Sequence, residues 1–232
     1  MKEHVLVVDD EKEIADLVEL YLKSEGYQVH KFYNGSDALS CIEKTKLDVA
    51  ILDVMLPDID GFKICQKIRE TYFYPIIMLT AKVEDTDKIM GLTLGADDYI
   101  LKPFNPLEVV ARVKTQLRRY KKYNPAEKTT SKEKTEYDIR GLVINSETHG
   151  CTLYGKEIQF TPIEFAILWY LCDHKGKVVS SEQLFEAVWG EKYYDSNNTV
   201  MTHIGKIREK LKEPARNPKF IKTVWGVGYK IE

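Results

Sequence analysis

The 232-residue sequence has no apolar run that approaches the roughly 20 residues of a membrane-spanning helix, so we expect a protein without a membrane partner. Its first residues, MKEHVLVVDDEKE, lack the apolar segment of a secretory signal, which predicts a cytoplasmic protein. The cysteines are few, far apart and without a C-x-x-C pair; they are Cys41, Cys65, Cys151 and Cys172. This spacing predicts reduced thiols and argues against a disulfide scaffold and a zinc site.

A surplus of one charge sign is also missing, because the net charge is only −2. The balance hides an asymmetry: residues 1–118 carry 15 basic and 21 acidic side chains, whereas residues 119–232 carry 19 and 15. The basic surplus lies late, since residues 206–232 carry 8 basic and 3 acidic side chains. An acidic part and a part with a basic end predict different partners for the two.

Residues 1–120 alternate short apolar runs with longer segments of helical periodicity. The apolar runs, each expected to form a strand, are residues 4–8, 27–32, 48–52, 75–79 and 98–101. Five strands alternating with about five helices predict an α/β doubly wound five-stranded parallel sheet with helices on both faces. In the first helical segment, one buried face is predicted from the spacing of Ile14, Leu17, Val18 and Tyr21.

The composition changes at residues 121–137, which contain proline, threonine, serine and charges of both signs but almost no apolar residue. This segment is predicted to be a flexible linker. Residues 138–232 follow another plan, with short strands in 138–160, three helices and a final hairpin. The sequence therefore predicts two domains, residues 1–120 and residues 138–232, and the second is of the α+β class.

The first helix of this second domain has a clear start signal. Thr161 can cap it, Pro162 suits its first position, and Glu164 completes a capping box. Two further helices are expected in SSEQLFEAVWG and NTVMTHIGKIREKLKE. The terminal segment KFIKTVWGVGYKIE predicts a hairpin around Gly226 and Gly228.

Charged and polar residues follow the predicted strands of the first domain at the point where each strand ends. They are Asp9 and Asp10 after the first strand, Asp53 after the third, Thr80 and Ala81 after the fourth, and Lys102 after the fifth. The carboxyl ends of parallel strands share one edge of the sheet, where doubly wound proteins bind ligands. Taken singly, each aspartate also suits a turn or a helix start, but the succession of such residues predicts one site.

Three carboxylates at one edge repel each other, and a hard divalent cation removes that conflict. Mg2+ prefers oxygen ligands and uses one or two carboxylates together with a phosphate. We expect Asp10 and Asp53 as direct ligands, Asp9 as a partner through water, and the Met55 carbonyl as a third protein oxygen.

A carboxylate with a free oxygen can attack phosphorus and form an aspartyl phosphate, so Asp53 is the candidate phosphoryl acceptor. Phosphoryl transfer requires mainly positioning and charge neutralisation. Lys102 can neutralise one phosphoryl oxygen, and the Thr80 hydroxyl and Ala81 amide can donate hydrogen bonds to another.

The segments VLVVDDE, AILDVMLPDIDG, MLTA and DYILKPF resemble the receiver domain of bacterial response regulators, over residues 2–120. The resemblance implies that a sensor histidine kinase donates the phosphoryl group to Asp53. It also implies a switch in which Thr80 moves toward the phosphoryl oxygens and Tyr99 turns inward. The Lys102–Pro103 peptide bond is then expected to be cis.

The third helix of the second domain has a polar face with Thr202 and Lys206. Its opposite, apolar face contains Val200, Ile204, Ile207 and Leu211. A helix with an apolar back and a cationic front suits the major groove of DNA. The same pattern also fits a helix whose charged face is only solvated.

The helix opening TPIEF and the hairpin TVWGVGYKI resemble the winged-helix DNA-binding domain of the OmpR/PhoB family, over residues 138–232. The resemblance implies DNA contacts from the third helix and from the hairpin. The candidates are Thr202, His203, Lys206, Arg208, Lys210, Lys222 and Thr223. Trp225 and Tyr229 are in or near the hairpin and are either contacts or structural residues. Gly205 departs from the family, which often has a basic residue there.

Charges of both signs alternate on the surface expected for helix 4, strand 5 and helix 5 of the first domain. They are Lys88, Asp97, Asp98, Glu108, Arg112 and Arg119. The OmpR/PhoB resemblance implies that this face forms the active homodimer, and we expect Lys88–Glu108 and Asp98–Arg112 pairs across it. These side chains could instead only be solvated.

The sequence thus predicts a response regulator whose phosphorylation promotes dimerisation and sequence-specific binding to promoter DNA, with RNA polymerase as a further partner. One alternative is a Mg2+ phosphatase with an aspartyl nucleophile, but Met55 stands where such enzymes usually have a second acid. Another is an adaptor whose second domain binds protein. The operator, the kinase, its signal and the relative orientation of the domains are not predicted.

Overall fold

The computed structural model describes residues 2–81, 95–122, 135–190, 199–214 and 216–232. The chain divides into two compact units, Met1–Arg118 and Arg119–Glu232. Most of the predicted linker lies outside the described residues, as do Lys88 and the helix expected between the fourth and fifth strands. Within the described ranges, no helix is long and apolar enough to cross a membrane.

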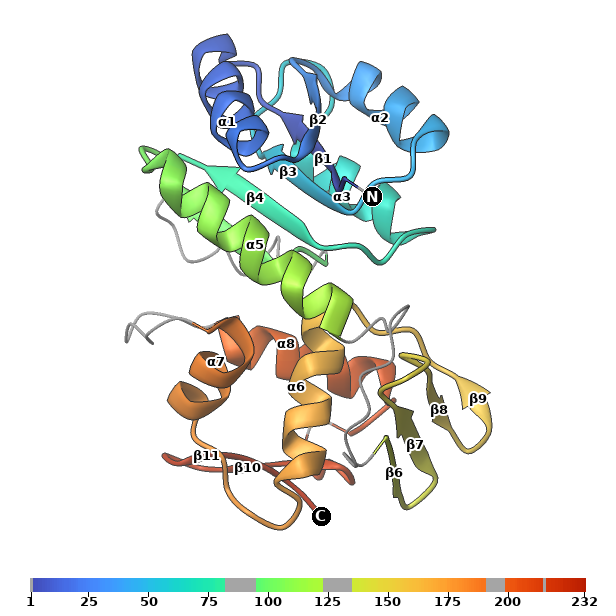
Figure 1. Ribbon diagram of the computed structural model, residues 1–232. Coiled ribbons are helices and arrows are strands. Elements are labelled where there is room, and N and C mark those ends of the chain that lie inside the picture. The colour runs from blue at the N-terminus through green and yellow to red at the C-terminus, as the bar shows by residue number, and fades with distance from the viewer. Residues whose placement is uncertain (1, 82–94, 123–134, 191–198, 215) are drawn as a thin grey trace. The chain divides into compact units, whose positions relative to one another are not determined.

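The first unit is a parallel sheet with helices on both faces (Figure 1). Its elements are β1 His4–Val8, α1 Lys12–Ser24, β2 Gln28–Phe32, α2 Gly35–Lys44, β3 Val49–Asp53, α3 Gly61–Arg69, β4 Ile76–Thr80, β5 Asp98–Leu101 and α5 Pro106–Lys122. The strand order is β2-β1-β3-β4-β5, and all neighbouring strands are parallel. The predicted doubly wound five-stranded sheet is confirmed.

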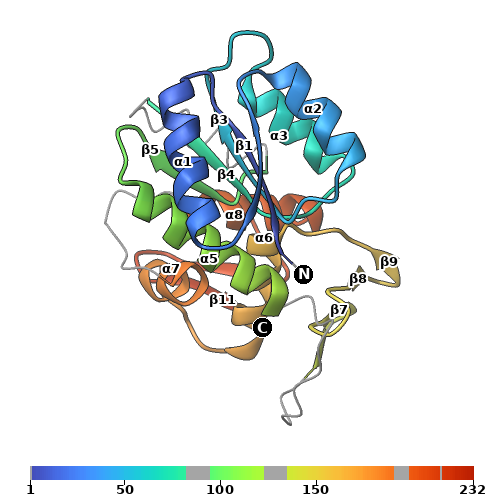
Figure 2. The same cartoon turned by 45° about the horizontal axis from the view of Figure 1, so that its top comes forward.

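Alternation along the central strands assigns their side chains to two apolar layers. Val5 and Val7 of β1 face the layer formed with α1 and α5, whereas α2 and α3 contact the other face of the sheet (Figure 2). β3 and β4 are buried along their whole length, which accounts for their nearly continuous apolar runs. The carboxylate of Asp53 therefore lies at the end of the most buried part of the sheet.

The buried face of α1 differs from the prediction at one position. Ala15, Val18 and Leu22 are fully buried, whereas Leu17 is exposed. The helix thus buries the i, i+3, i+7 row that begins at Ala15.

The second unit combines a small antiparallel sheet, three helices and a hairpin. Its elements are β6 Glu136–Ile139, β7 Leu142–Asn145, β8 Cys151–Leu153, β9 Lys156–Glu157, α6 Pro162–Asp173, α7 Ser181–Trp189, α8 Thr199–Lys210, β10 Ile221–Val224 and β11 Gly228–Ile231. β6 to β9 pair in sequence order, and β10 pairs with β11. This is the α+β arrangement that the sequence predicts.

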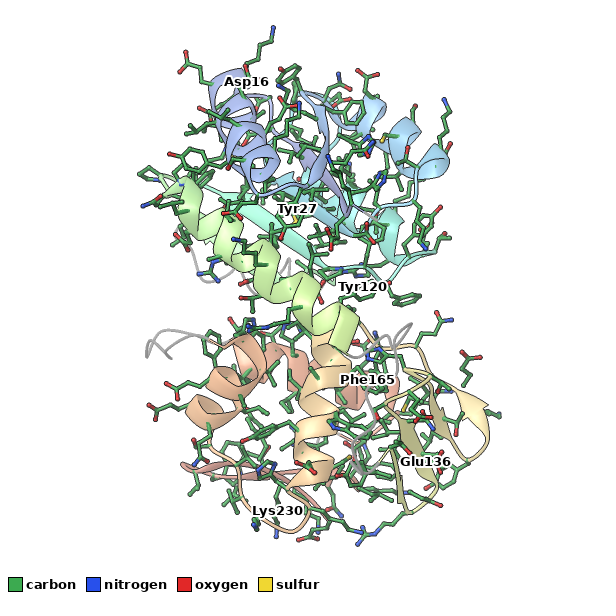
Figure 3. The ribbon with its side chains drawn as sticks, viewed as in Figure 1. Asp16, Tyr27, Tyr120, Glu136, Phe165 and Lys230 are labelled. Carbon is green, nitrogen blue, oxygen red and sulfur yellow. The ribbon has the colours of Figure 1, made fainter. Side chains whose placement is uncertain are left out.

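The start of α6 has the predicted capping geometry. The Glu164 amide donates to the Thr161 hydroxyl, and the Glu164 carboxylate accepts a hydrogen bond from the Thr161 amide. α6 is apolar on almost all sides and crosses the centre of the unit, where Phe165 is buried in the core (Figure 3). α7, α8 and both sheets pack around it, which fixes the outer face of α8 relative to the hairpin.

Candidate functional site

The carboxyl ends of the strands bring the predicted site residues of the first unit together. Asp9 follows β1 and is fully buried, and Asp53, which ends the neighbouring β3, is 4% exposed. Thr80 ends β4 and is 2% exposed, whereas Ala81 beside it is exposed. Lys102 follows β5, and its amide donates to the Thr80 carbonyl at 2.7 Å. The parallel topology thus converts distant sequence positions into one pocket.

The Lys102 ammonium group is the centre of the pocket. It lies 2.8 Å from Asp9 Oδ2, 3.1 Å from Asp53 Oδ2 and 3.0 Å from Glu11 Oε1. The second Asp53 oxygen, Oδ1, accepts a hydrogen bond from the Met55 amide at 3.3 Å. Asp53 is therefore held by one cation and one backbone donor, and Lys102 adjoins one of its oxygens.

Burial shifts the ionisation of this cluster. Burial raises the pKa of Asp9 to about 6, the hydrogen bond from Lys102 opposes the rise, and the charge of Asp53 adds to it. Burial also raises the pKa of Asp53, against the charge and hydrogen bond of Lys102. For Lys102, burial lowers the pKa, but the hydrogen bonds to Asp9 and Glu11 raise it overall. The single ammonium group of Lys102 therefore neutralises only part of the negative charge of the acidic cluster.

Asp9→Asn is expected to stabilise the metal-free protein at pH 7 by about 1–3 kcal/mol. The pKa of Asp9 is higher in the folded than in the unfolded chain, so its ionisation destabilises the folded state as pH rises from about 4 to about 6. Denaturant unfolding at pH 5 and pH 7 measures this, and the wild-type loss between the two should shrink in the variant. An equal loss in both proteins would contradict it.

The acidic residues fit the ligand set of a hard divalent cation. Asp9, Asp10 and Asp53 offer carboxylate oxygens that lie within 4.8 Å of one another. Asp10 is exposed while the other two are buried, so the cluster is open to solvent on one side. An all-oxygen set that is short of positive charge and open to water matches the preferences of Mg2+.

The loop that follows Asp53 is fixed by contacts with two helices. The Gly61 amide, at the start of α3, donates to the Val54 carbonyl at 3.0 Å. Asp58 accepts hydrogen bonds from the Gly35 and Ser36 amides and the Ser36 hydroxyl at 2.7–2.9 Å, which attaches the loop to the N-terminus of α2. This attachment lowers the pKa of Asp58, chiefly through the Ser36 hydroxyl.

Gly61→Ala is expected to destabilise the first unit by about 1–3 kcal/mol and to slow phosphoryl uptake. A Cβ atom at Gly61 would lie 2.0 Å from the backbone oxygen of Asp53, so either α3 or the Asp53 backbone must move. Thermal unfolding and the rate of labelling by a small phosphodonor measure both effects.

Gly205→Ala is the matched control, because a Cβ atom there meets nothing within 4 Å. Gly205 is exposed in α8, so alanine should stabilise the second unit by up to about 1 kcal/mol and leave labelling unchanged. Unchanged stability and labelling of Gly61→Ala would show that the close approach is unimportant.

The predicted switch residues occupy adjoining strands. Thr80 is buried at the end of β4, and Tyr99 is partly buried in β5. The Lys102–Pro103 bond is cis, as predicted. The movement of Thr80 and Tyr99 on phosphorylation stays a prediction.

The predicted dimer face contains ion pairs within one chain. Arg112 lies 3.0 Å from Asp98 Oδ2 and 2.9 Å from Glu108 Oε1. Arg112 and Asp98 therefore pair within the chain, and the expected Asp98–Arg112 pair across an interface stays a prediction. Lys88 and the Arg119 side chain lie outside the described residues.

Asp97 differs from the prediction for this face, because it is not a surface residue. It is fully buried, and its Oδ2 lies 2.6 Å from an Arg69 nitrogen and accepts the Ile76 amide at 2.8 Å. Asp97 immediately precedes β5, and its side chain turns inward toward the C-terminal end of α3. Its charge therefore has its partner, Arg69, inside the first unit.

Only some of the residues predicted to contact DNA lie on the outer face of α8. Thr202 and Lys206 are partly exposed, and Lys206 pairs with Glu209 at 2.8 Å. His203 is only 1% exposed, and its ring lies 5.6 Å from the Trp189 ring. The predicted contact from His203 is thus wrong, because this side chain belongs to the apolar back of the helix.

Two further cations of α8 are engaged inside the second unit. Arg208 donates to the Ile221 carbonyl at 2.7 Å and to the Thr223 hydroxyl at 2.8 Å, and its guanidinium lies over the Tyr229 ring. Lys210 pairs with the buried Glu164 at 2.5 Å. Both cations hold α8 to its neighbours, so they are positioning residues rather than free contacts.

The hairpin residues also differ in their exposure. Lys222 is partly exposed and pairs with Glu232, and Thr223 accepts the hydrogen bond from Arg208. Tyr229 is 8% exposed and therefore structural, whereas Trp225 is 90% exposed and is not. Burial therefore favours the structural role for Tyr229, and a contact from Trp225 stays a prediction.

Sequence reasoning missed three residues that shape the site. Glu11 contacts Lys102, Asp58 attaches the loop after Asp53 to α2, and Arg69 neutralises Asp97. Glu11 and Asp58 lie within the segments that resemble the receiver domain, but nothing in their spacing shows which side chain they contact. Arg69 is distinguished only as a cation near the end of an amphipathic helix.

Comparison with known proteins identifies both units. Residues 5–114 match the model of the response regulator receiver domain, and residues 155–231 match that of the C-terminal domain of transcriptional regulatory proteins. Regulatory protein VanRc of Enterococcus gallinarum is 64% identical over 232 residues, which is the full length of both chains. The chain belongs to the OmpR/PhoB family of response regulators.

Other members of the OmpR/PhoB family are similar over the whole length. Regulatory protein VanR of Enterococcus faecium is 58% identical over 235 residues, with full coverage of both chains. Among solved structures, response regulator DrrB of Thermotoga maritima, an OmpR/PhoB homologue, is 37% identical with a TM-score of 0.53, covering 100% of this chain and 99% of that one. A RitR mutant is 28% identical with a TM-score of 0.76 and 99% coverage of both chains.

The family assignment decides between the alternatives that the sequence left open. The chain is a two-component response regulator with a receiver domain and a DNA-binding domain, and its relatives are transcriptional regulators rather than enzymes. A histidine kinase and DNA are the partners that these two domains imply. The phosphatase interpretation is wrong, and an adaptor without DNA binding does not fit the second domain.

Proposed function

We propose that Asp53 accepts a phosphoryl group from a sensor histidine kinase and that this event increases the affinity of the second unit for promoter DNA. The observation that supports the proposal is the placement of Asp53. It is a buried carboxylate at a strand end, with Lys102 at 3.1 Å and two further carboxylates beside it. A structural carboxylate requires one compensating partner, whereas this one lies in a cluster built for a larger anion and a cation.

In the proposed reaction, an Asp53 carboxylate oxygen forms a bond to phosphorus as the bond between phosphorus and the kinase histidine nitrogen breaks. Lys102 stabilises the charge on a phosphoryl oxygen, and the Thr80 hydroxyl and the Ala81 amide donate to others. The Met55 amide, which donates to Asp53 Oδ1, keeps the carboxylate oriented. Asp9 and Glu11 hold Lys102 in place before phosphate arrives.

We assign the Mg2+ ligands to Asp10 and Asp53, with Asp9 as a partner through water and the Met55 carbonyl as a further oxygen. When bound, Mg2+ supplies positive charge to the phosphoryl oxygens. The oxygen-only ligand set and the raised pKa of Asp9 both support a divalent cation at this cluster.

We further propose that phosphorylation promotes a homodimer through the face of β5 and α5. Asp98, Glu108 and Arg112 form the network on this face, and Lys88 and Arg119 are its other predicted members.

Two copies would present two α8 helices to DNA half-sites about 10 bp apart, from where the regulator can contact RNA polymerase. The candidate DNA contacts are Thr202 and Lys206, with Lys222 and Thr223 beside them. From the similarity to VanR, the regulated genes are those of vancomycin resistance.

A DNA-binding assay on the region upstream of the protein's own gene tests the proposal. Untreated protein is compared with protein given a small phosphodonor and Mg2+, and sedimentation measures the oligomeric state in parallel. Phosphodonor treatment should raise affinity about 5- to 150-fold and convert monomer to dimer, since coupling energies of about 1–3 kcal/mol are typical. Equal affinity before and after verified phosphorylation would overturn it.

A further inference from the structure

Two histidines meet between β1 and β2, toward the edge of the first sheet that lies opposite the aspartate cluster. His4 begins β1, and His30 lies in the parallel neighbour β2. In the register of the two strands, His4 is opposite Gln28 and Leu6 is opposite His30. Because side chains alternate along a strand, the two histidines are diagonal neighbours on one face of the sheet. Both are partly exposed, so solvent reaches the pair.

The two imidazole rings meet edge to edge. His4 Nδ1 lies 3.0 Å from His30 Nε2, the ring centroids are 5.2 Å apart, and the ring planes are 16° from parallel. With two nitrogen atoms this close, such a centroid separation arises only when the rings extend away from each other. The two nitrogen atoms therefore face each other and share one proton, which the N–H of one ring donates to the lone pair of the other.

Backbone contacts fix the strands that carry the pair. The His4 amide donates to Asp48 Oδ2 at 2.8 Å, and the Asp48 amide donates to the His4 carbonyl at 2.9 Å. The Gln28 amide donates to the Glu3 carbonyl at 2.9 Å, which joins the start of β2 to the start of β1. Because the two strands already hold both rings, a ligand of the pair requires little ordering of the chain.

The surroundings favour uncharged rings, which is the form of histidine that binds metal ions. Burial lowers the pKa of His30, and the charge of a protonated His4 lowers it further. Two imidazolium groups 3.0 Å apart would repel each other. Asp48 adds a carboxylate beside the His4 backbone, so a cation is preferred to an anion at this place.

Imidazole nitrogen selects a different class of cation from the aspartate cluster. Mg2+ prefers oxygen ligands, whereas imidazole suits Cu2+, Ni2+ and Zn2+. Bonds of about 2.0–2.1 Å from two rings to one ion place neighbouring nitrogen atoms about 2.9–3.4 Å apart. The present separation of 3.0 Å falls in this range, so rotation of the rings suffices to aim both lone pairs at one ion.

Water completes the coordination of such an ion. Among the residues that the structure describes, no third histidine, cysteine or acid places a ligand atom within 4.8 Å of both nitrogen atoms. The spacing of the cysteines argues against a thiolate zinc site and does not bear on a site built from imidazoles. On binding, the ring that donates the shared proton takes up its other tautomer, with the proton on the outer nitrogen.

We propose that His4 and His30 form a binding site for a divalent transition-metal ion, which holds Cu2+ more tightly than Zn2+ and joins the edge strand β2 to β1. The order of affinity follows from the general preference of nitrogen sites for Cu2+. The ion contacts both strands together only in the folded chain, so its binding stabilises the first unit. This site is separate from the proposed phosphoryl chemistry at the carboxyl ends of the strands.

The experiment uses full-length protein without an affinity tag, titrated with Cu2+ or Zn2+ in the presence of excess Mg2+ to saturate the aspartate cluster. His4→Gln and His30→Gln each remove one ring. His174→Gln is the matched control, because this partly exposed ring contacts only the Tyr170 carbonyl among the hydrogen-bond partners that the structure gives it. Calorimetry measures affinity, electron paramagnetic resonance counts the nitrogen ligands of Cu2+, and circular dichroism verifies folding and measures thermal unfolding.

The wild type should bind Cu2+ through two imidazole nitrogens and Zn2+ more weakly. At a Cu2+ concentration about tenfold above the dissociation constant, its Tm should rise by about 4 °C or more. His4→Gln and His30→Gln should each weaken Cu2+ binding at least about tenfold and abolish the rise in Tm, because each leaves a single ring. His174→Gln should match the wild type in affinity and Tm.

The comparison of His30→Gln with the wild type is decisive. The amino terminus and His4 can chelate Cu2+ without the second ring, and this substitution leaves both of them in place. Equal Cu2+ affinity of His30→Gln and the wild type would therefore overturn the inference. A wild type that binds neither metal, or whose Cu2+ spectrum shows a single imidazole nitrogen, would overturn it as well and would leave the pair as a hydrogen bond between two strands.

Discussion

Asp53→Asn protein treated with a small phosphodonor and Mg2+ is expected to gain no phosphoryl group and no affinity for DNA. Asparagine keeps the size of the side chain and an oxygen that accepts the Met55 amide, so the β3–α3 loop should hold its position. It removes the carboxylate charge and the nucleophilic oxygen beside Lys102. The loss should be complete rather than partial, because among the described residues Asp53 is the buried carboxylate that combines the Lys102 ammonium with two neighbouring acids.

Intact-protein mass spectrometry at neutral pH measures the adduct, and the DNA assay measures its consequence. Asp37→Asn is the matched control, since Asp37 is exposed in the first turn of α2 and should leave phosphorylation unchanged. Phosphoryl uptake by Asp53→Asn at the wild-type rate would show that another residue is the acceptor. If the wild type gains a phosphoryl group but its affinity for DNA does not change, phosphorylation does not control DNA binding.

Arg69→Met is expected to destabilise the first unit by about 3–5 kcal/mol, the range for breaking a buried ion pair on one side. Arg69 compensates the fully buried Asp97 at 2.6 Å and also donates to the carbonyls of Gly95 and Tyr74 at 2.8 Å. Methionine fills similar space but leaves the Asp97 charge and two carbonyls without these donors. Denaturant unfolding of the variant measures the loss.

A double-mutant cycle separates the charge from the packing. Arg69→Met combined with Asp97→Asn should recover at least half of the loss, because asparagine still accepts the Ile76 amide and carries no charge. Arg118→Met, at an exposed arginine, should change stability by less than about 0.5 kcal/mol. Additive losses in the double variant would show that Arg69 acts through packing alone.

The strand ends were predictable because sequence and topology constrain them together. Asp9, Asp53 and Lys102 each follow an apolar run, and parallel strands bring such residues to one edge whatever the loops between them do. The start of α6 was predictable for a similar reason, since Thr161 and Glu164 form a capping box through local contacts only. Features set by local chemistry or by strand alternation are readable from one sequence.

Side-chain partners between elements were not predictable in this way. Asp97 and Asp98 are adjacent acids, yet one is buried with Arg69 and the other pairs with Arg112, because successive strand residues point to opposite faces. On α8, His203 belongs to the core, and Arg208 faces the hairpin. A shift of the helix face by a single residue decides whether a side chain is buried or exposed. Helical periodicity in the sequence does not define the face that accurately.

The attachment of Asp58 to the start of α2 has a consequence for genetics. The Ser36 hydroxyl and amide hold Asp58 in the loop that follows Asp53, and a Cβ atom at Gly35 would lie 2.8 Å from Ile59 in that loop. A screen for alleles that silence the regulator while leaving every pocket residue intact should therefore recover substitutions at these two positions, 17 and 18 residues upstream of the acceptor.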